Sequence, residues 1–133
     1  MPYTVDWYVP NQVIYCRVFG NATIDEIVLA NEDMITLLET QGNAHIHIIT
    51  DVLELKNTPI TLSKLSDASK SVRHENAGWH IVVTDRRLFE FLSNTISQIW
   101  RNSHVKGAST LTDAIAILKK NDPDIHWSND AIN

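Results

Sequence analysis

The sequence predicts an α/β domain with a mostly parallel five-stranded sheet and one antiparallel edge strand. Short β-rich runs alternate with helical runs along most of the chain. Only a short turn separates the first two β-rich runs, and such a connection joins antiparallel strands. Helical stretches separate the later runs, which favours parallel neighbours and right-handed crossovers. The expected element order is therefore β-β-α-β-α-β-α-β-α.

The strands are expected where β-forming residues gather between turn signals. The run from Tyr3 to Val9 alternates in hydropathy, and Pro10-Asn11 marks the turn into the second strand. The third run carries Asp51 near its carboxyl end. The expected strands cover residues 3–9, 12–19, 45–53, 79–83 and 105–108.

Helices are expected between and after the later strands, and the first two have clear start signals. Thr23 precedes the first, and Glu26 follows it at the spacing of a capping box. Thr58 is well placed to cap the second, because Pro59 then occupies the first helical position, where its missing N–H costs nothing. The expected helices cover about residues 23–40, 58–76, 84–100 and 111–120.

The whole chain, residues 1–133, is expected to form one domain of ordinary size. The sequence contains no internal repeat, low-complexity stretch or linker. The tail from about residue 124 should be loose, because it is polar apart from three apolar residues. Among these, Trp127 is the side chain that we expect at an interface or on a groove.

Composition favours a cytoplasmic protein without a nucleic-acid partner. The formal net charge is −5 at pH 7, and the basic residues are scattered, whereas phosphate binding needs them gathered. The single cysteine, Cys16, cannot form an internal disulfide and fits a reducing compartment. No apolar run approaches the roughly 20 residues of a membrane-spanning helix, and no signal-peptide pattern opens the chain.

Three histidines and two aspartates are the candidates for metal chemistry. His45 and His47 should share one face of a strand, and with His80 on another strand they could bind a metal. We nevertheless expect no metal and no cofactor, because a structural site needs a fourth ligand. Asp51 and Asp85 each follow a strand, at the edge where open α/β sheets place their sites. They could form a paired-carboxylate or magnesium site, or serve as helix caps and loop carboxylates.

The remaining candidates point away from catalysis. The chain lacks the GxSxG, GxGxxG and Walker A patterns, which disfavours the usual hydrolases and nucleotide enzymes. Cys16 lies within a strand, where an inert thiol is expected instead of a nucleophile. Arg86 and Arg87, near the start of a helix, could bind an anion or form a solvated charge pair. We therefore expect a protein that is not an enzyme.

Four stretches together carry a resemblance to a known family. They hold a strand followed by a glycine and a Thr-to-Glu helix start, a strand ending in aspartate, the next strand, and a closing helix. These stretches are residues 13–26, 47–51, 79–83 and 111–118. In this combination, from Tyr3 to Trp127, the chain resembles the anti-sigma-factor-antagonist fold of the STAS domains and their SpoIIAA-like relatives.

The resemblance implies a bacterial, cytoplasmic signalling protein that binds a kinase or another regulator and is not an enzyme. In the best-known members, a Ser or Thr at the start of the second helix is phosphorylated. The corresponding residue here is Thr58, with Thr61 and Ser63 as further candidates, although Thr58 could be only a helix cap. The family's Asp-Ser-Ser/Thr-Gly signature is absent from this stretch.

The resemblance also implies where a partner would bind. The expected interaction loop comprises Asp51, Lys56, Asn57 and Thr58. Two further interpretations stay open. The chain could be a small-molecule or lipid-binding domain of the same fold, and it could form a homodimer.

Overall fold

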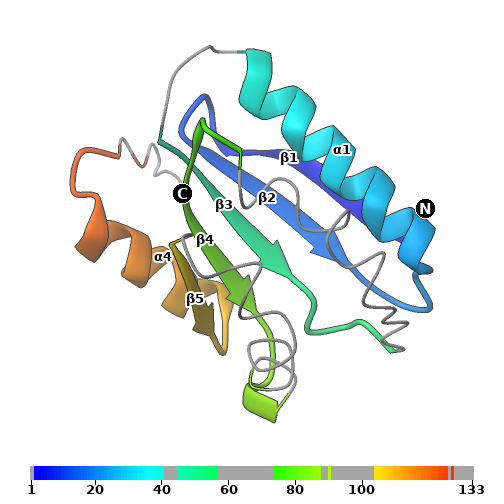
Figure 1. Cartoon of the computed structure of the whole chain (residues 1–133). Coiled ribbons are helices and arrows are strands. Elements are labelled where there is room, and N and C mark those ends of the chain that lie inside the picture. Colours follow the sequence, from blue (N-terminus) through cyan, green and yellow to red (C-terminus); the bar gives the residue numbers. More distant parts are fainter. Residues whose placement is uncertain are drawn as a thin grey trace.

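The computed structural model describes residues 2–40, 45–56, 74–87, 90, 104–125 and 127. A single five-stranded sheet occupies this part of the chain, with the strands in sequence order from one edge to the other (Figure 1). The strands are β1 (Tyr3–Val9), β2 (Val13–Val18), β3 (Ile46–Asp51), β4 (Ala77–Val83) and β5 (Val105–Ala108). Two helices, α1 (Ile24–Thr40) and α4 (Leu111–Asn121), pack on the sheet.

The sheet is mixed, as the sequence predicts. β1 is antiparallel to β2 and forms one edge, and every other neighbouring pair is parallel. The hairpin between them closes with a hydrogen bond from the Gln12 N–H to the Val9 carbonyl at 3.0 Å. Asn11 adopts a left-handed backbone conformation in this turn, with φ 65°. The predicted fold class and edge strand are thus confirmed.

β4 begins earlier than expected. Ala77 and Gly78, which we expected to break a helix, already belong to the strand, and Ala77 pairs with Ile46 of β3. Residues 74–76, expected at the end of the second helix, form the turn before β4. Most of the second and third expected helices lies outside the described residues.

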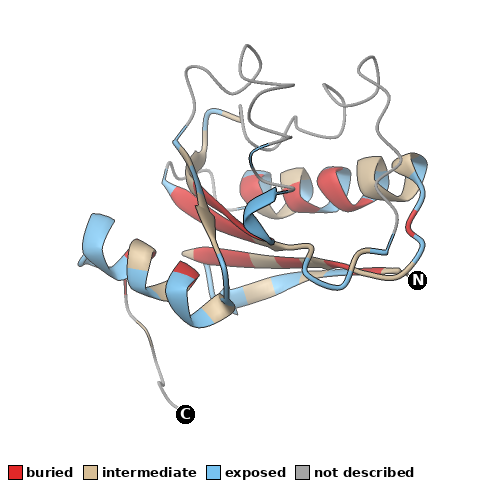
Figure 2. Cartoon of the chain, turned by 90° about the horizontal axis from the view of Figure 1, so that it is seen from below, coloured by how far each residue is buried: buried red, intermediate tan, exposed pale blue. Residues whose placement is uncertain are grey.

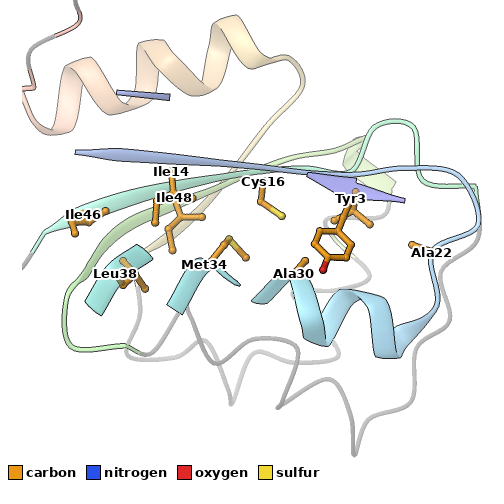
Figure 3. Packing of buried hydrophobic residues seen from close by; sticks show 10 residues of the cluster. Tyr3, Ile14, Cys16, Ala22, Ala30, Met34, Leu38, Ile46 and Ile48 are labelled. Atoms are coloured by element: carbon orange, nitrogen blue, oxygen red, sulfur yellow. The ribbon is translucent and has the colours of Figure 1, made fainter. Parts of the chain in front are cut away.

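α1 covers one face of the sheet and begins at the predicted capping box. The Thr23 Oγ1 accepts the Glu26 N–H at 3.2 Å, and the Glu26 carboxylate accepts the Thr23 N–H at 2.8 Å. Ala30, Met34 and Leu38 recur every four residues and form the stripe that faces the sheet. Figure 3 shows this stripe packed against side chains of β1, β2 and β3.

α4 lies on the opposite face of the sheet (Figure 3). The Thr110 side chain caps it by accepting the Asp113 N–H at 3.1 Å. Ala114 and Leu118 are buried against Ile49 of β3 and the odd-numbered apolar residues of β4. Figure 2 shows the buried positions gathered in the strands between the two helices, while the outer side of α4 is exposed.

The start of the tail contacts the rest of the chain; residues 126 and 128–133 lie outside the described residues, so the loose tail stays a prediction. Ile125 is buried in the core beneath α4. The Trp127 ring packs edge-on against Tyr8, 6.2 Å between centroids, and the Lys119 ammonium lies 5.7 Å from its centroid. Trp127 therefore rests on its own domain. Among the described residues, no helix has the length and apolar character needed to cross a membrane.

Candidate functional site

Asp51 ends β3 and is fixed by two hydrogen bonds. The Tyr15 hydroxyl donates to its Oδ2 at 2.7 Å, and the Leu53 N–H donates to its Oδ1 at 3.1 Å. Because Tyr15 belongs to β2, the first bond ties two parallel strands together. Burial, and then the bond to Asp51, raises the pKa of the Tyr15 hydroxyl far above its usual value, so it stays a donor. The Asp51 carboxylate therefore shapes the turn after β3.

After this turn the chain runs beside Gly20 and extends the β2–β3 ladder. The Gly20 N–H donates to the Glu54 carbonyl at 2.9 Å, and the Lys56 N–H donates to the Gly20 carbonyl at 2.8 Å. Gly20 and Leu55 thereby form an isolated parallel bridge. Gly20 has φ 65°, a conformation that glycine adopts without strain. Backbone hydrogen bonds between residue 20 and residues 54–56 thus brace the chain at this edge of the sheet.

An open hollow of about 530 Å³ lies at this edge. Its walls combine apolar side chains with two charged ones, from Phe19, Gly20, Leu53, Glu54, Leu55 and Lys56. We call these six residues the carboxyl-edge surface. Leu53 is 47% exposed and is one of three large apolar side chains that stand exposed among the described residues. Leu53 thus places exposed apolar surface on a turn whose backbone is braced.

Arg17 supports one flank of the carboxyl-edge surface. Its guanidinium lies over the Phe19 ring, 4.4 Å from the centroid, and is ion-paired with the Glu54 carboxylate. The Glu54 side chain is two-thirds exposed, so the pair adds little to folding stability. The two contacts of Arg17 orient the Phe19 ring and the Glu54 carboxylate beside Leu53.

The predicted interaction loop is described only up to Lys56. Lys56 is exposed and follows directly on the Gly20–Leu55 bridge. Asn57, Thr58, Thr61 and Ser63 lie outside the described residues. Their predicted roles, as part of the loop and as switch candidates, stay predictions.

Arg86 and Arg87 follow β4 at the same edge of the sheet, and both are exposed. The Arg86 Nε donates to a carboxylate oxygen of Glu90 at 3.0 Å, one helical turn further on. Anion binding by the two arginines stays a prediction. Asp85, the other aspartate after a strand, is also exposed.

The three histidines considered as metal ligands do not converge. His80 pairs with Ile48 and lies on the face covered by α1, whereas His47, adjacent to Ile48 in β3, lies on the other face. His45 precedes β3, with φ 71°, so the prediction that it shares a strand face with His47 is wrong. Within the described ranges, no three His, Cys, Asp or Glu side chains are grouped as a metal ion requires.

His80 is instead a buried neutral residue. Its Nε2 lies 2.7 Å from the Thr50 Oγ1. Burial lowers the pKa of His80 to about 4. In the part of the chain that the structure describes, its Nδ1 has no hydrogen-bond partner.

His47 forms an aspartate–histidine pair that sequence reasoning missed. Its Nδ1 accepts the Trp79 N–H at 2.8 Å, and its Nε2 lies 2.7 Å from the Asp122 Oδ2. Because Nδ1 is an acceptor, the ring proton sits on Nε2 and is donated to Asp122. The two residues are 75 positions apart in the sequence, so no local signal linked them.

Neither His47 nor Cys16 is poised for catalysis. Both ring nitrogens of His47 are engaged, which leaves no lone pair for a substrate proton. Cys16 is buried beneath α1, and burial raises the pKa of its thiol to about 12. A nucleophilic cysteine requires an accessible thiolate, so this thiol is inert at neutral pH.

Comparison with known proteins identifies similar folds. No family model matches the sequence, and no curated protein matches it. A protein of the DUF3478 family from Shewanella loihica PV-4, described as having a SpoIIAA-like fold, is 14% identical with a TM-score of 0.63, over 87% of this chain and 93% of its own. The phosphorylated form of SpoIIAA, a Bacillus cell fate determinant, is 14% identical with a TM-score of 0.53, over 87% of this chain and 98% of its own.

The structural matches cover nearly the full length of both proteins. At 14% identity the likeness concerns the fold. It agrees with the resemblance that the four sequence stretches carry. The chain therefore has the SpoIIAA-like fold of the STAS domains.

Proposed function

We propose that this chain is a non-catalytic regulatory module that binds a protein partner through its carboxyl-edge surface. The observation that carries the proposal is the exposed Leu53, held on a turn that Asp51 and the Gly20–Leu55 bridge brace. A backbone segment already held in place loses little conformational entropy on binding. The charged Glu54 and Lys56 beside it supply the polar rim that protein interfaces carry.

The partner is a kinase or another regulator in the bacterial cytoplasm. This part of the proposal rests on the fold that the chain shares with SpoIIAA, a cell fate determinant. The engaged His47 and the buried Cys16 support a role in binding over one in catalysis.

A phosphorylation switch belongs to the same proposal. Thr58 is the acceptor, with Thr61 and Ser63 as further candidates, and the comparison structure of SpoIIAA is its phosphorylated form. A phosphate adds nearly two negative charges. Thr58 lies two positions after the exposed Lys56, so this phosphate would change the local charge that a partner meets from positive to negative.

The hollow favours a second candidate function, the binding of a small apolar ligand. Its volume of about 530 Å³ lies within the range of small-molecule sites. Phe19, Leu53 and Leu55 provide apolar walls. In this case the same surface would serve a ligand instead of a protein.

Two leucines of equal exposure provide the test. Leu53 and Leu29 are each 47% exposed, but Leu29 lies on α1 and does not line the carboxyl-edge surface. The tagged chain and the variants Leu53→Asp and Leu29→Asp are cross-linked in the native host and their partners identified by mass spectrometry. We expect Leu53→Asp to reduce recovery of the main partner at least about tenfold, the size of a hot-spot loss, and Leu29→Asp to leave it unchanged.

Equal recovery with all three proteins would contradict binding at the carboxyl-edge surface. Native mass spectrometry of the same preparations addresses the second candidate. An apolar ligand that is bound to the wild type and to Leu29→Asp, but not to Leu53→Asp, would establish ligand binding in place of a protein partner.

A further inference from the structure

A second hollow, of about 370 Å³, lies at the opposite edge of the sheet, where β3, β4 and β5 begin and α4 ends. Its lining comes from four separate segments of the chain: His45, His47, Ala77, Gly78, Trp79, His104, Asn121 and Asp122. We call it the amino-edge hollow. It shares no residue with the carboxyl-edge surface.

The shape of the amino-edge hollow is specified by the sequence. A Cβ on Gly78 would stand 2.7 Å from the His47 Nδ1 and 3.2 Å from the His45 Cα, so only glycine fits. His45 itself holds φ 71°, which a non-glycine residue rarely adopts. β4 gains one residue relative to β3 here, because Ile46 pairs with Ala77 while Ile48 pairs with His80. Such irregularities cluster where a protein positions groups for binding.

Two acceptor groups at the end of α4, the Asp122 carboxylate and the Asn121 side-chain oxygen, line the hollow. Asp122 carries the fixed negative charge, and the hydrogen bond from His47 holds the pKa of its carboxyl below its usual value. The Asn121 amide nitrogen donates one of its two hydrogens to the Ile117 carbonyl at 2.8 Å, and its Oδ1 can accept a hydrogen bond from a ligand. A ligand that donates hydrogen bonds and carries positive charge would match these two acceptor groups.

The aromatic wall also suits a cation. The Lys106 ammonium lies 5.0 Å from the Trp79 ring centroid, so this ring already attracts a positive group. The His104 ring packs against the same indole, 4.8 Å between centroids. The formal net charge of −5 further favours cationic ligands over anionic ones.

From this geometry we propose that the amino-edge hollow binds a small organic ammonium ion. The ammonium group donates to the Asp122 carboxylate and the Asn121 Oδ1, and its aliphatic part lies against Trp79. Lys106 places a positive charge beside the same ring and opposes the bound ammonium. This site is independent of the function proposed for the carboxyl-edge surface.

The experiment compares three probes of equal length: butylamine, butanol and butyrate. Each is titrated into the full chain at pH 7.5, and the ¹H–¹⁵N signal of the Trp79 indole reports occupancy. We expect saturable shifts with butylamine and none with butanol or butyrate. Saturable binding of butyrate, with no binding of butylamine, would overturn the proposal, because it would show that the imidazoles form an anion site. No saturation by any probe would overturn it as well.

Four variants test whether butylamine binds in the amino-edge hollow or is only attracted to the negative charge of the whole protein. Asp122→Asn, which keeps an oxygen for the His47 N–H, should weaken butylamine binding about tenfold, as expected for loss of a charged hydrogen bond. Lys106→Met should strengthen binding severalfold, because it removes a positive charge that repels the bound ammonium. The controls Asp113→Asn and Lys120→Met change exposed charges of α4 and should have no effect. The proposal would be contradicted if Asp122→Asn and Asp113→Asn had equal effects, or if Lys106→Met and Lys120→Met did.

Discussion

The His47 imidazole occupies the space that any side chain on Gly78 would need. The ring lies against the start of β4, where it accepts the Trp79 N–H and donates to Asp122 at the end of α4. One buried side chain thus connects two strands and a helix. The missing Cβ of Gly78 is what makes this connection possible.

Gly78→Ala should therefore destabilise the fold by about 2 kcal/mol, the usual cost of overpacking a buried position. The added methyl must displace the His47 ring or the His45 backbone. Urea denaturation at pH 7.5 provides the measurement. In a His47→Ala background the same change should cost clearly less, because the main collision is gone. Equal costs in both backgrounds would show that the two residues do not compete for space.

Tyr15→Phe should lower the free energy of unfolding by about 1.5–3 kcal/mol, the contribution of a hydrogen bond to a charged group. The change deletes only the hydroxyl that donates to Asp51 at 2.7 Å. Tyr8→Phe is the matched control, because the Tyr8 side chain is exposed. Denaturant titrations of the two variants should differ. A loss with Tyr8→Phe as large as that with Tyr15→Phe would argue against a special role for the Asp51 bond.

His80 should make the protein less stable in mild acid. Its folded-state pKa of about 4 lies below the ordinary value of 6.5, so the unfolded chain binds the proton more readily. Its contribution to stability is complete above pH 6.5 and is lost as the pH falls toward 4. The slope of unfolding free energy approaches about 1.4 kcal/mol per pH unit for one proton. His80→Leu should flatten this slope, while His104→Gln, at an exposed position, should not.

Cys16 should not react with thiol reagents in the folded protein. It is almost completely buried, and its pKa is raised to about 12. Incubation with iodoacetamide at pH 8 should leave the intact mass unchanged, and unfolding in urea should expose one reactive thiol per chain. Modification of the native protein on the same timescale as the unfolded one would contradict this burial.

Thr58 should respond to substitution as a phosphate acceptor if the proposed switch operates. Thr58→Asp keeps a capping side chain and adds negative charge, so it should weaken partner binding. Thr58→Ser keeps both the cap and the acceptor and should bind as the wild type does. Mass spectrometry of protein from the native host should find phosphate at this position. Unchanged binding by Thr58→Asp, together with no phosphate, would leave Thr58 as a helix cap only.

The sequence predicted the parts of the fold that have local causes. Alternating β-formers placed β1, and the spacing of Thr23 and Glu26 placed the start of α1, because each signal lies within a few neighbouring residues. Pairing of β1 with β2 followed from the short turn alone. The turn residue Asp51 was also recognised, since it ends a strand at the edge where sites occur.

The amino edge could not be predicted in the same way. Its contacts join His47 to Asp122 and Trp79, which only the folded sheet brings together. Gly78 appeared as a helix breaker because nothing nearby in the sequence shows that a distant ring needs its space. The strand pattern also placed His45 inside β3, although its positive φ keeps it out. Long-range packing decided each of these positions.

β3 carries one candidate surface at each of its ends. His47 and Asp51 lie on the same face of this strand, four residues and about 13 Å apart. No small ligand can span that distance through a closely packed core. The two ends of β3 could therefore be altered separately, by natural selection or by protein engineering. The contacts at one end would be kept while the other end acquires a new binding specificity.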